Sequence, residues 1–160
     1  MQIFLVSPAG KSTGSIGGVN PPNKSDAAPF VTGDYIAAIG GEGRDYATLV
    51  EAARRMPDYR FVIVAREKSL LNLAVPDNVT SYTNLALSKT MNVLQNAKIA
   101  VVPLKTNRTP CGHVTIVAGM HLGKAQVVTY SEGVANYVED GKTGVHAHVG
   151  DAADLKTQMT

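Results

Sequence analysis

Two short loops in this sequence combine glycine with basic side chains, a pairing that suits the binding of an anion. The first is Gly40-Gly41-Glu42-Gly43-Arg44, and the second runs from Leu104 to Gly112 and carries Lys105 and Arg108. Each loop follows a short apolar run. Glycine lets a bound group approach the backbone closely, and basic side chains supply charge-assisted hydrogen bonds. Both loops are therefore candidates for a phosphate-binding site.

The second loop leads into Gly112-His113-Val114-Thr115, which we predict to open a helix. Free N–H groups and the dipole at a helix start favour an anion, the dipole by about 0.3–1 kcal/mol per charge. His113 could polarise a phosphate oxygen or a sugar hydroxyl, and Arg44 could reach the same cleft from the first loop. The competing interpretation is that Gly112 only eases a turn and that the cations are solvated.

Three other motifs suggest chemistry that we do not expect. His146 and His148 share one face of an expected strand, but the sequence offers no third ligand, so we predict no metal site. Cys111 and His113 are two apart at a helix start, a spacing that rarely brings side chains together as a catalytic pair. Gly10-Lys11-Ser12 resembles the end of a P-loop but lacks the first glycine of that motif. No catalytic nucleophile or general base is identifiable.

Apolar runs and amphipathic stretches alternate from Thr32 onward, which places both loops in a common framework. We expect strands at 35–39, 60–65, 78–82, 98–103, 125–129 and 145–149, helices at 45–56, 88–96 (with Ser88 as its cap) and 112–122, and a last helix starting at Asp151. This alternation predicts an α/β fold: a Rossmann-like, doubly wound, mostly parallel sheet with helices on both faces. Ligands of such sheets bind at the carboxyl ends of the strands, where both loops would lie.

Composition excludes several classes of protein for this chain. The chain has 160 residues, 44% of them apolar and 18% charged, as in one soluble globular domain. A net charge of +2 is too small to predict binding to nucleic acid or to an anionic membrane. The apolar runs are too short for a transmembrane segment, the start lacks a basic leader, and a single cysteine forms no disulfide framework, so we expect a cytoplasmic protein.

The chain divides into two parts by composition. Residues 1–31 contain a strand-like start and a linker rich in Gly, Pro and Ser, and residues 32–160 carry the alternating pattern of a single domain.

Motifs from Tyr35 onward, over about four fifths of the chain, follow an order known from one enzyme family. The chain resembles the carboxy-terminal, donor-binding domain of retaining GT-B glycosyltransferases, the large family that includes sucrose and trehalose-phosphate synthases. The matching segments are Ile39-Gly40-Gly41 with Arg44-Asp45-Tyr46 and Thr48-Leu49, Pro76-Asp77-Asn78-Val79, Val101-Val102-Pro103-Leu104, Ala118-Gly119-Met120-His121-Leu122-Gly123-Lys124, and Tyr137-Val138-Glu139-Asp140-Gly141-Lys142-Thr143-Gly144.

This resemblance implies a GT-B-type domain that binds a nucleotide-diphosphate sugar as donor substrate, with no further cofactor. It implies that the base stacks near Leu85 to Leu87 and Leu104. The residues that we expect to hold the diphosphate are Gly40, Gly41, Arg44, Lys105, Arg108, Gly112, His113, Val114 and Thr115.

The sequence also departs from the family. Two family glutamates eight residues apart, the second of which grips the nucleotide ribose, are replaced by Pro110 and Ala118, and Asn136 stands where a glutamate often sits, with Glu132 nearby. The acceptor domain of the family is also missing, although Met1 to Val6 with Gly17-Gly18 resembles its opening, so we interpret the chain as a fragment or as lacking an internal stretch.

These features predict a glycosyltransferase donor domain that is weak or inactive alone and needs a separate acceptor-domain partner. One alternative is a non-catalytic binding module with a decayed donor site, whose exposed former interdomain face serves self-association or binds a partner. Another is a fragment of a nucleotide-sugar epimerase.

Overall fold

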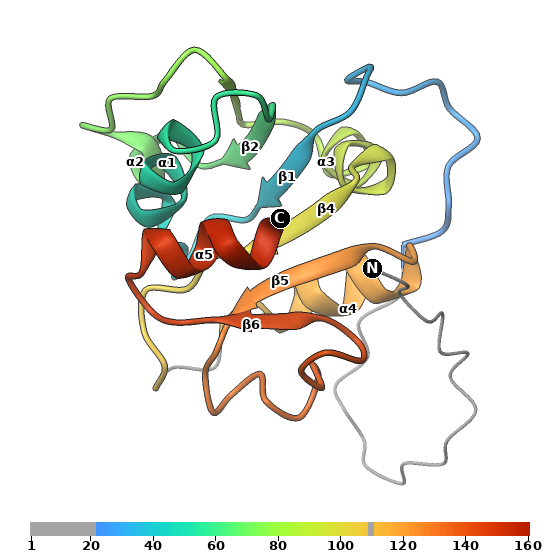
Figure 1. The fold of residues 1–160 in the computed structure, drawn as a ribbon. Coiled ribbons are helices and arrows are strands. Elements are labelled where there is room, and N and C mark those ends of the chain that lie inside the picture. Colours follow the sequence, from blue (N-terminus) through green and yellow to red (C-terminus); the bar gives the residue numbers. More distant parts are fainter. Residues whose placement is uncertain (1–21, 109–110) are drawn as a thin grey trace, which may run out of the picture.

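The described part of the protein is a parallel sheet covered on both faces by helices (Figure 1). The computed structural model describes residues 22–108 and 111–160, and all structural statements concern these residues. The elements are β1 (Ile36–Ile39), α1 (Tyr46–Arg54), β2 (Phe61–Ala65), α2 (Glu67–Leu70), β3 (Val79–Thr83), α3 (Leu87–Asn96), β4 (Ile99–Val102), α4 (His113–His121), β5 (Ala125–Thr129), β6 (Val145–Ala147) and α5 (Ala152–Met159).

The six strands lie in the order β3-β2-β1-β4-β5-β6, and every neighbouring pair is parallel. This order is that of a doubly wound Rossmann-type sheet, so the predicted fold class is confirmed. The sheet is parallel throughout, where the sequence predicted a mostly parallel one.

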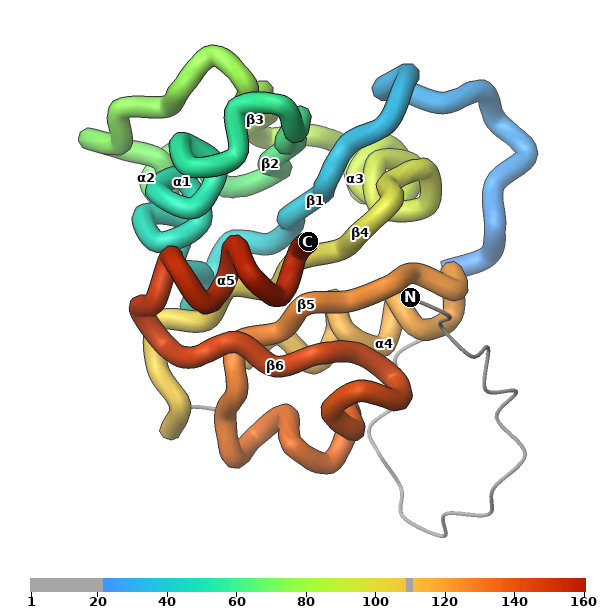
Figure 2. The backbone as a smooth tube through the Cα atoms, in the orientation of Figure 1, coloured from blue at the N-terminus to red at the C-terminus, as the bar shows by residue number. Residues whose placement is uncertain are grey.

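Alternate residues of the central strand face two separate cores. Ile36 and Ala38 belong to one cluster, with side chains from α1 and α5, whereas Ala37 and Ile39 belong to a second cluster with side chains from α3 and α4. Figure 2 shows α1 and α5 on one side of the sheet and α3 and α4 on the other. Because both faces are covered, the central strands β1, β2 and β4 are continuous apolar runs, whereas burial alternates along the edge strand β3.

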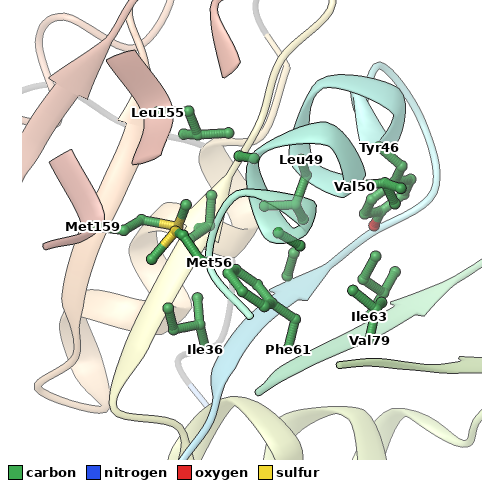
Figure 3. Close-up of a cluster of buried hydrophobic side chains, with 14 of the residues drawn as sticks. Ile36, Tyr46, Leu49, Val50, Met56, Phe61, Ile63, Val79, Leu155 and Met159 are labelled. Atoms are coloured by element: carbon green, nitrogen blue, oxygen red, sulfur yellow. The ribbon is translucent and has the colours of Figure 1, made fainter. Parts of the chain in front are cut away.

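The first core is closed by the last helix. Leu155 and Met159 of α5 lie beside Leu49 of α1 and Met56, while Phe61 fills the space below them (Figure 3). The C-terminal helix therefore belongs to the same packed unit as the strands that begin the domain.

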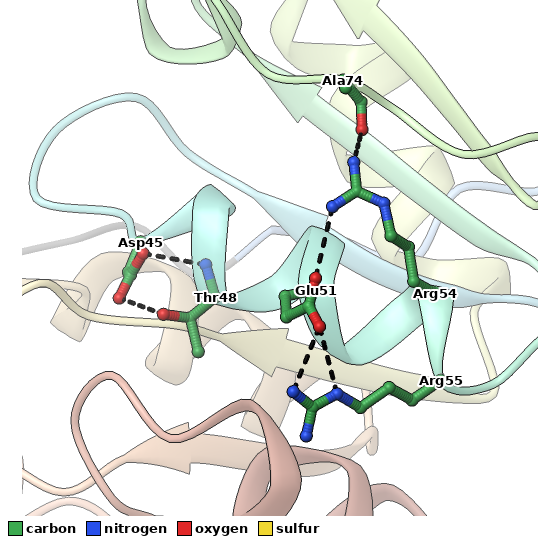
Figure 4. Close-up of polar contacts among 6 residues, drawn as sticks. All are labelled: Asp45, Thr48, Glu51, Arg54, Arg55 and Ala74. Carbon is green, nitrogen blue, oxygen red and sulfur yellow. Dashed lines mark hydrogen bonds and ion pairs between the residues drawn. The ribbon is translucent and has the colours of Figure 1, made fainter.

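Side-chain caps fix where two of the helices begin. Asp45 accepts a hydrogen bond from the Thr48 backbone N at 3.0 Å and another from the Thr48 hydroxyl at 2.6 Å (Figure 4). Asp151 caps α5 in the same way by accepting from the Asp154 backbone N at 2.9 Å. These residues satisfy backbone donors that the helix itself leaves free. On the outer face of α1, Glu51 pairs with Arg54 and Arg55.

The secondary structure differs from the sequence predictions in three places. Ser88 is not the cap of α3, because that helix begins one residue earlier and Ala86 occupies the cap position without a side-chain bond. The helix α2 was missed because four residues are too few to show helical periodicity. The last strand ends at Ala147, two residues sooner than predicted.

Residues 22–30, which we call the strap, run along α3 without forming a helix or strand. The Gln95 amide accepts from the Ser25 backbone N and donates to its carbonyl, each at 2.8 Å. Asn92 accepts from the Phe30 backbone N at 2.7 Å. The strap is therefore bound to α3 by two side-chain amides. The P-loop-like motif and the strand-like start of the chain lie outside the described residues.

None of the helices in the described ranges has the length and apolar character needed to cross a membrane.

Candidate functional site

The two glycine-containing loops meet at the centre of the sheet. β1 and β4 are neighbours. After β1 the chain continues toward one edge of the sheet, and after β4 it continues toward the other, which is the switch point where doubly wound sheets bind ligands. The loops are bonded to each other, since the Asp45 backbone N donates to the carbonyl of Pro103 at 2.9 Å and the Lys105 backbone N donates to the carbonyl of Gly43 at 3.0 Å. The structure thus brings together the two loops that the sequence singled out.

Arg44 lies between the first loop and the start of α4 and is only 6% exposed. Its Nε donates to the Ile39 carbonyl at 3.2 Å, and its Nη1 donates to the Glu42 carbonyl at 3.1 Å. Its Nη2 donates to the hydroxyl of Thr115 at 2.9 Å, which links the first loop to the first turn of α4. A guanidinium has five N–H donors, so two remain beyond these three bonds.

No Asp or Glu of the described residues pairs with this buried guanidinium. Burial lowers the pKa of Arg44 because the charged form loses its water. A buried charge without a counter-ion is unfavourable, and a bound anion would relieve that penalty.

Glycine is required at two positions of the site for a reason that the sequence did not reveal. A Cβ placed on Gly40, whose φ is +125°, would lie 2.7 Å from Nη2 of the buried Arg44. Gly112 has a φ of +88°, and a Cβ there would lie 2.9 Å from Cγ1 of Val102. The missing side chain of Gly112 thus faces Val102 and Leu104 of the protein itself, so packing is a second reason for glycine here, beside the expected approach of a ligand.

The other cations lie at the surface. Lys105, Arg108 and His113 are exposed around the loop and the start of α4. Sequence reasoning missed Arg66 and Lys68, which pair with the Glu42 carboxylate of the first loop. A hydrogen bond from Lys68, together with the charges of Lys68 and Arg66, lowers the pKa of Glu42. Their position directly after the apolar run of β2 was a signal that could have found them.

A groove of about 430 Å³ lies between α3 and α4, beside this site. Leu87 and Val114, in the first turns of these helices, are 74% and 48% exposed, so the groove reaches the carboxyl edge of the sheet. The strap lines the opposite end. The lining residues are Pro22, Asn23, Ser25, Leu87, Ser88, Met91, Asn92, Gln95, Val114 and Ala118.

The histidines considered for metal binding have separate partners. The ring of His146 lies 3.0 Å from the carbonyl of Val138 through Nε2, and His148 pairs with Asp154 at 2.7 Å. In the described ranges, no three His, Cys, Asp or Glu side chains are grouped so that they could hold a metal ion.

At the positions where the sequence departs from the family, Ala118 is buried and lines the groove, and Asn136 and Glu132 are exposed. Pro110 lies outside the described residues.

A doubly wound parallel sheet with helices on both faces defines a Rossmann-like α/β domain. The family model described as "Glycosyl transferases group 1" matches residues 42–160, and the chain belongs to that family. A search of curated proteins gives no match.

Solved structures with the same fold include GT-B glycosyltransferases, which confirms the predicted resemblance. HepE from Anabaena in complex with UDP and glucose has a TM-score of 0.62 at 16% identity, over 78% of this chain and 37% of that one. A glycosyltransferase from Rickettsia africae has a TM-score of 0.63 at 16% identity, over 81% and 37%. Sucrose-phosphate synthase from Thermosynechococcus elongatus has a TM-score of 0.63 at 22% identity, over 78% and 35%. The chain therefore spans little more than a third of the length of these proteins.

Proposed function

We propose that this chain binds the nucleoside diphosphate part of a sugar nucleotide and supplies the donor side of a glycosyl transfer to an acceptor hydroxyl. The observation that carries the proposal is Arg44, a buried guanidinium between the two loops that is bonded to the first turn of α4 and has no carboxylate partner among the described residues. The complex of HepE with UDP-glucose supports a sugar nucleotide as the ligand class.

In such a reaction the diphosphate gains negative charge as the bond to the sugar breaks, so preorganised donors that face it lower the barrier. The N–H groups at the start of α4, together with its dipole, would provide part of this stabilisation. Arg44 has two N–H donors to offer, and the exposed Lys105 and Arg108 would close over the phosphates from the second loop.

The groove between α3 and α4 is our proposed place for the nucleoside. Val114 lines the groove and stands next to Thr115, whose hydroxyl binds Arg44. A diphosphate at the head of α4 would thus leave its nucleoside beside the groove mouth. Leu87, in the segment where the family resemblance places the base, lines the same mouth.

We further propose that acceptor binding comes from another domain or a separate chain, because this chain spans only 37% of HepE. The chain alone is then expected to show little transfer activity. We expect the reaction to take place in the cytoplasm.

Isothermal titration with UDP, GDP and ADP tests the proposal. We expect binding of at least one nucleotide, weakened about tenfold or more by Arg44→Lys, which keeps the charge but loses the planar fork of donors. Lys105→Ala and Thr115→Val provide readouts that do not depend on an Arg44 variant folding. Arg55→Ala is the matched control for Lys105→Ala, because it also removes one positive charge but does so at the end of α1, away from the site.

The proposal fails if folded wild-type protein binds none of the three nucleotides. It also fails if Arg55→Ala weakens binding as much as Lys105→Ala does, because the interaction would then follow net charge rather than the site.

One observation favours a second candidate, a non-catalytic interaction module. Each of the three nitrogens of Arg44 already bonds within the protein, as expected of a purely structural residue. This candidate predicts no nucleotide binding together with concentration-dependent self-association in analytical ultracentrifugation.

A further inference from the structure

We infer that the nucleoside groove of this protein does not select for the ribose 2′-hydroxyl, so that 2′-deoxyribonucleoside diphosphates bind as well as ribonucleoside diphosphates. The inference rests on the proposed function, since it concerns the same site and specifies which donors it takes.

The described lining of the groove carries no charged side chain. Leu87, Met91, Val114 and Ala118 form its apolar walls along the two helices. Ala118 lies one turn beyond Val114, so the second turn of α4 offers only a methyl group to a ligand that enters from the carboxyl edge.

The two amide side chains in the lining are already committed to the strap. Asn92 accepts from the Phe30 backbone N at 2.7 Å and donates to the carbonyl of Ala28 at 3.3 Å. Gln95 makes both of its bonds with the backbone of Ser25. An amide that turned toward a ribose would release a strap residue. The remaining polar side chains, Asn23, Ser25 and Ser88, are neutral and exposed to water.

Selection for a hydroxyl requires a buried partner that loses a hydrogen bond when the hydroxyl is missing. A site with such a partner rejects the analogue that lacks the hydroxyl by several orders of magnitude, whereas an apolar wall discriminates weakly. Because this groove is open along one side and apolar along the other, a 2′-hydroxyl keeps its water and gains no protein partner.

Titration of the wild-type protein with UDP and with dUDP, which differ only at the 2′ position, tests the inference. We expect the two dissociation constants to agree within about threefold. Ala118→Glu introduces a carboxylate at a buried position of the groove and is expected to favour UDP over dUDP by about tenfold or more, since hydrogen bonds to charged groups are among the stronger ones. Ser88→Asp introduces a carboxylate at an exposed position of the groove, where water competes for it, and is expected to shift the ratio the same way by about threefold.

Ser88 is exposed in the first turn of α3, where an acidic residue suits the helix dipole, so Ser88→Asp gives a readout even if Ala118→Glu does not fold. His121→Glu is the matched control, because it adds a carboxylate at the end of α4 outside the groove and should leave the UDP/dUDP ratio unchanged.

A tenfold or greater preference of the wild-type protein for UDP would overturn the inference, and so would an unchanged ratio in both groove variants. Either result would leave the proposed function intact, because nucleotide binding itself would have been observed. If the wild-type protein binds no nucleoside diphosphate at all, the proposed function falls and the inference falls with it.

Discussion

Replacing Gly112 by alanine tests whether a side chain at this position would clash with its packed neighbours. Its φ of +88° is unfavourable for a side chain, by about 1–2 kcal/mol. The new Cβ would also lie 2.9 Å from Val102 Cγ1 and 3.2 Å from Leu104 Cδ2, and overpacking of this kind costs about 1–3 kcal/mol. We therefore expect Gly112→Ala to lower the free energy of unfolding by about 2–5 kcal/mol.

Gly141→Ala is the matched control for this experiment. Gly141 has a similar φ of +73°, but a Cβ there would meet nothing within 4 Å. Its substitution should therefore cost only the backbone term of about 1–2 kcal/mol. Urea denaturation followed by circular dichroism measures both variants. Equal losses would refute the packing argument, because they would show that the neighbouring Val102 and Leu104 move aside freely.

Three further predictions concern the frame that positions the site. Asp45→Ala should lower the free energy of unfolding by about 0.5–2 kcal/mol in urea denaturation, whereas Ser88→Ala, at a position that caps nothing, should change it by less than about 0.5 kcal/mol. Burial raises the pKa of Tyr35 to about 12, so the buried phenol stabilises the fold below pH 10 and this contribution is lost as the pH rises toward 12. Burial also raises the pKa of Tyr46, so Tyr35→Phe should reduce the alkaline loss of stability without abolishing it, and an unchanged curve would contradict the assignment. Phe61→Ala should destabilise by about 3–5 kcal/mol and the exposed Tyr59→Ala by less than about 0.5 kcal/mol, as measured by denaturant midpoints; similar midpoints would argue against the core of Figure 3.

Much of the fold could be predicted because the sheet is covered on both faces. The central strands of such a sheet are apolar throughout, and β1, β2 and β4 are therefore recognisable to within one residue at each end. The alternation of these runs with helices fixes a parallel sheet, and a parallel sheet fixes the edge at which the loops gather. By contrast, the start of α3 was misplaced because Ser88 has the right residue type for a cap but lies inside the first turn.

The amino-acid sequence alone determined the class of fold and the edge of the sheet at which the two glycine-containing loops meet, since periodicity and loop composition are local properties of the chain. Only the tertiary structure decided that Arg44 is buried against Thr115, 71 positions away, and that the glycines make room for the protein's own side chains. It alone also decided that the strap and two helices enclose a groove without a charged wall among the described residues. Burial and contact across such separations depend on how the elements pack, which no local pattern records.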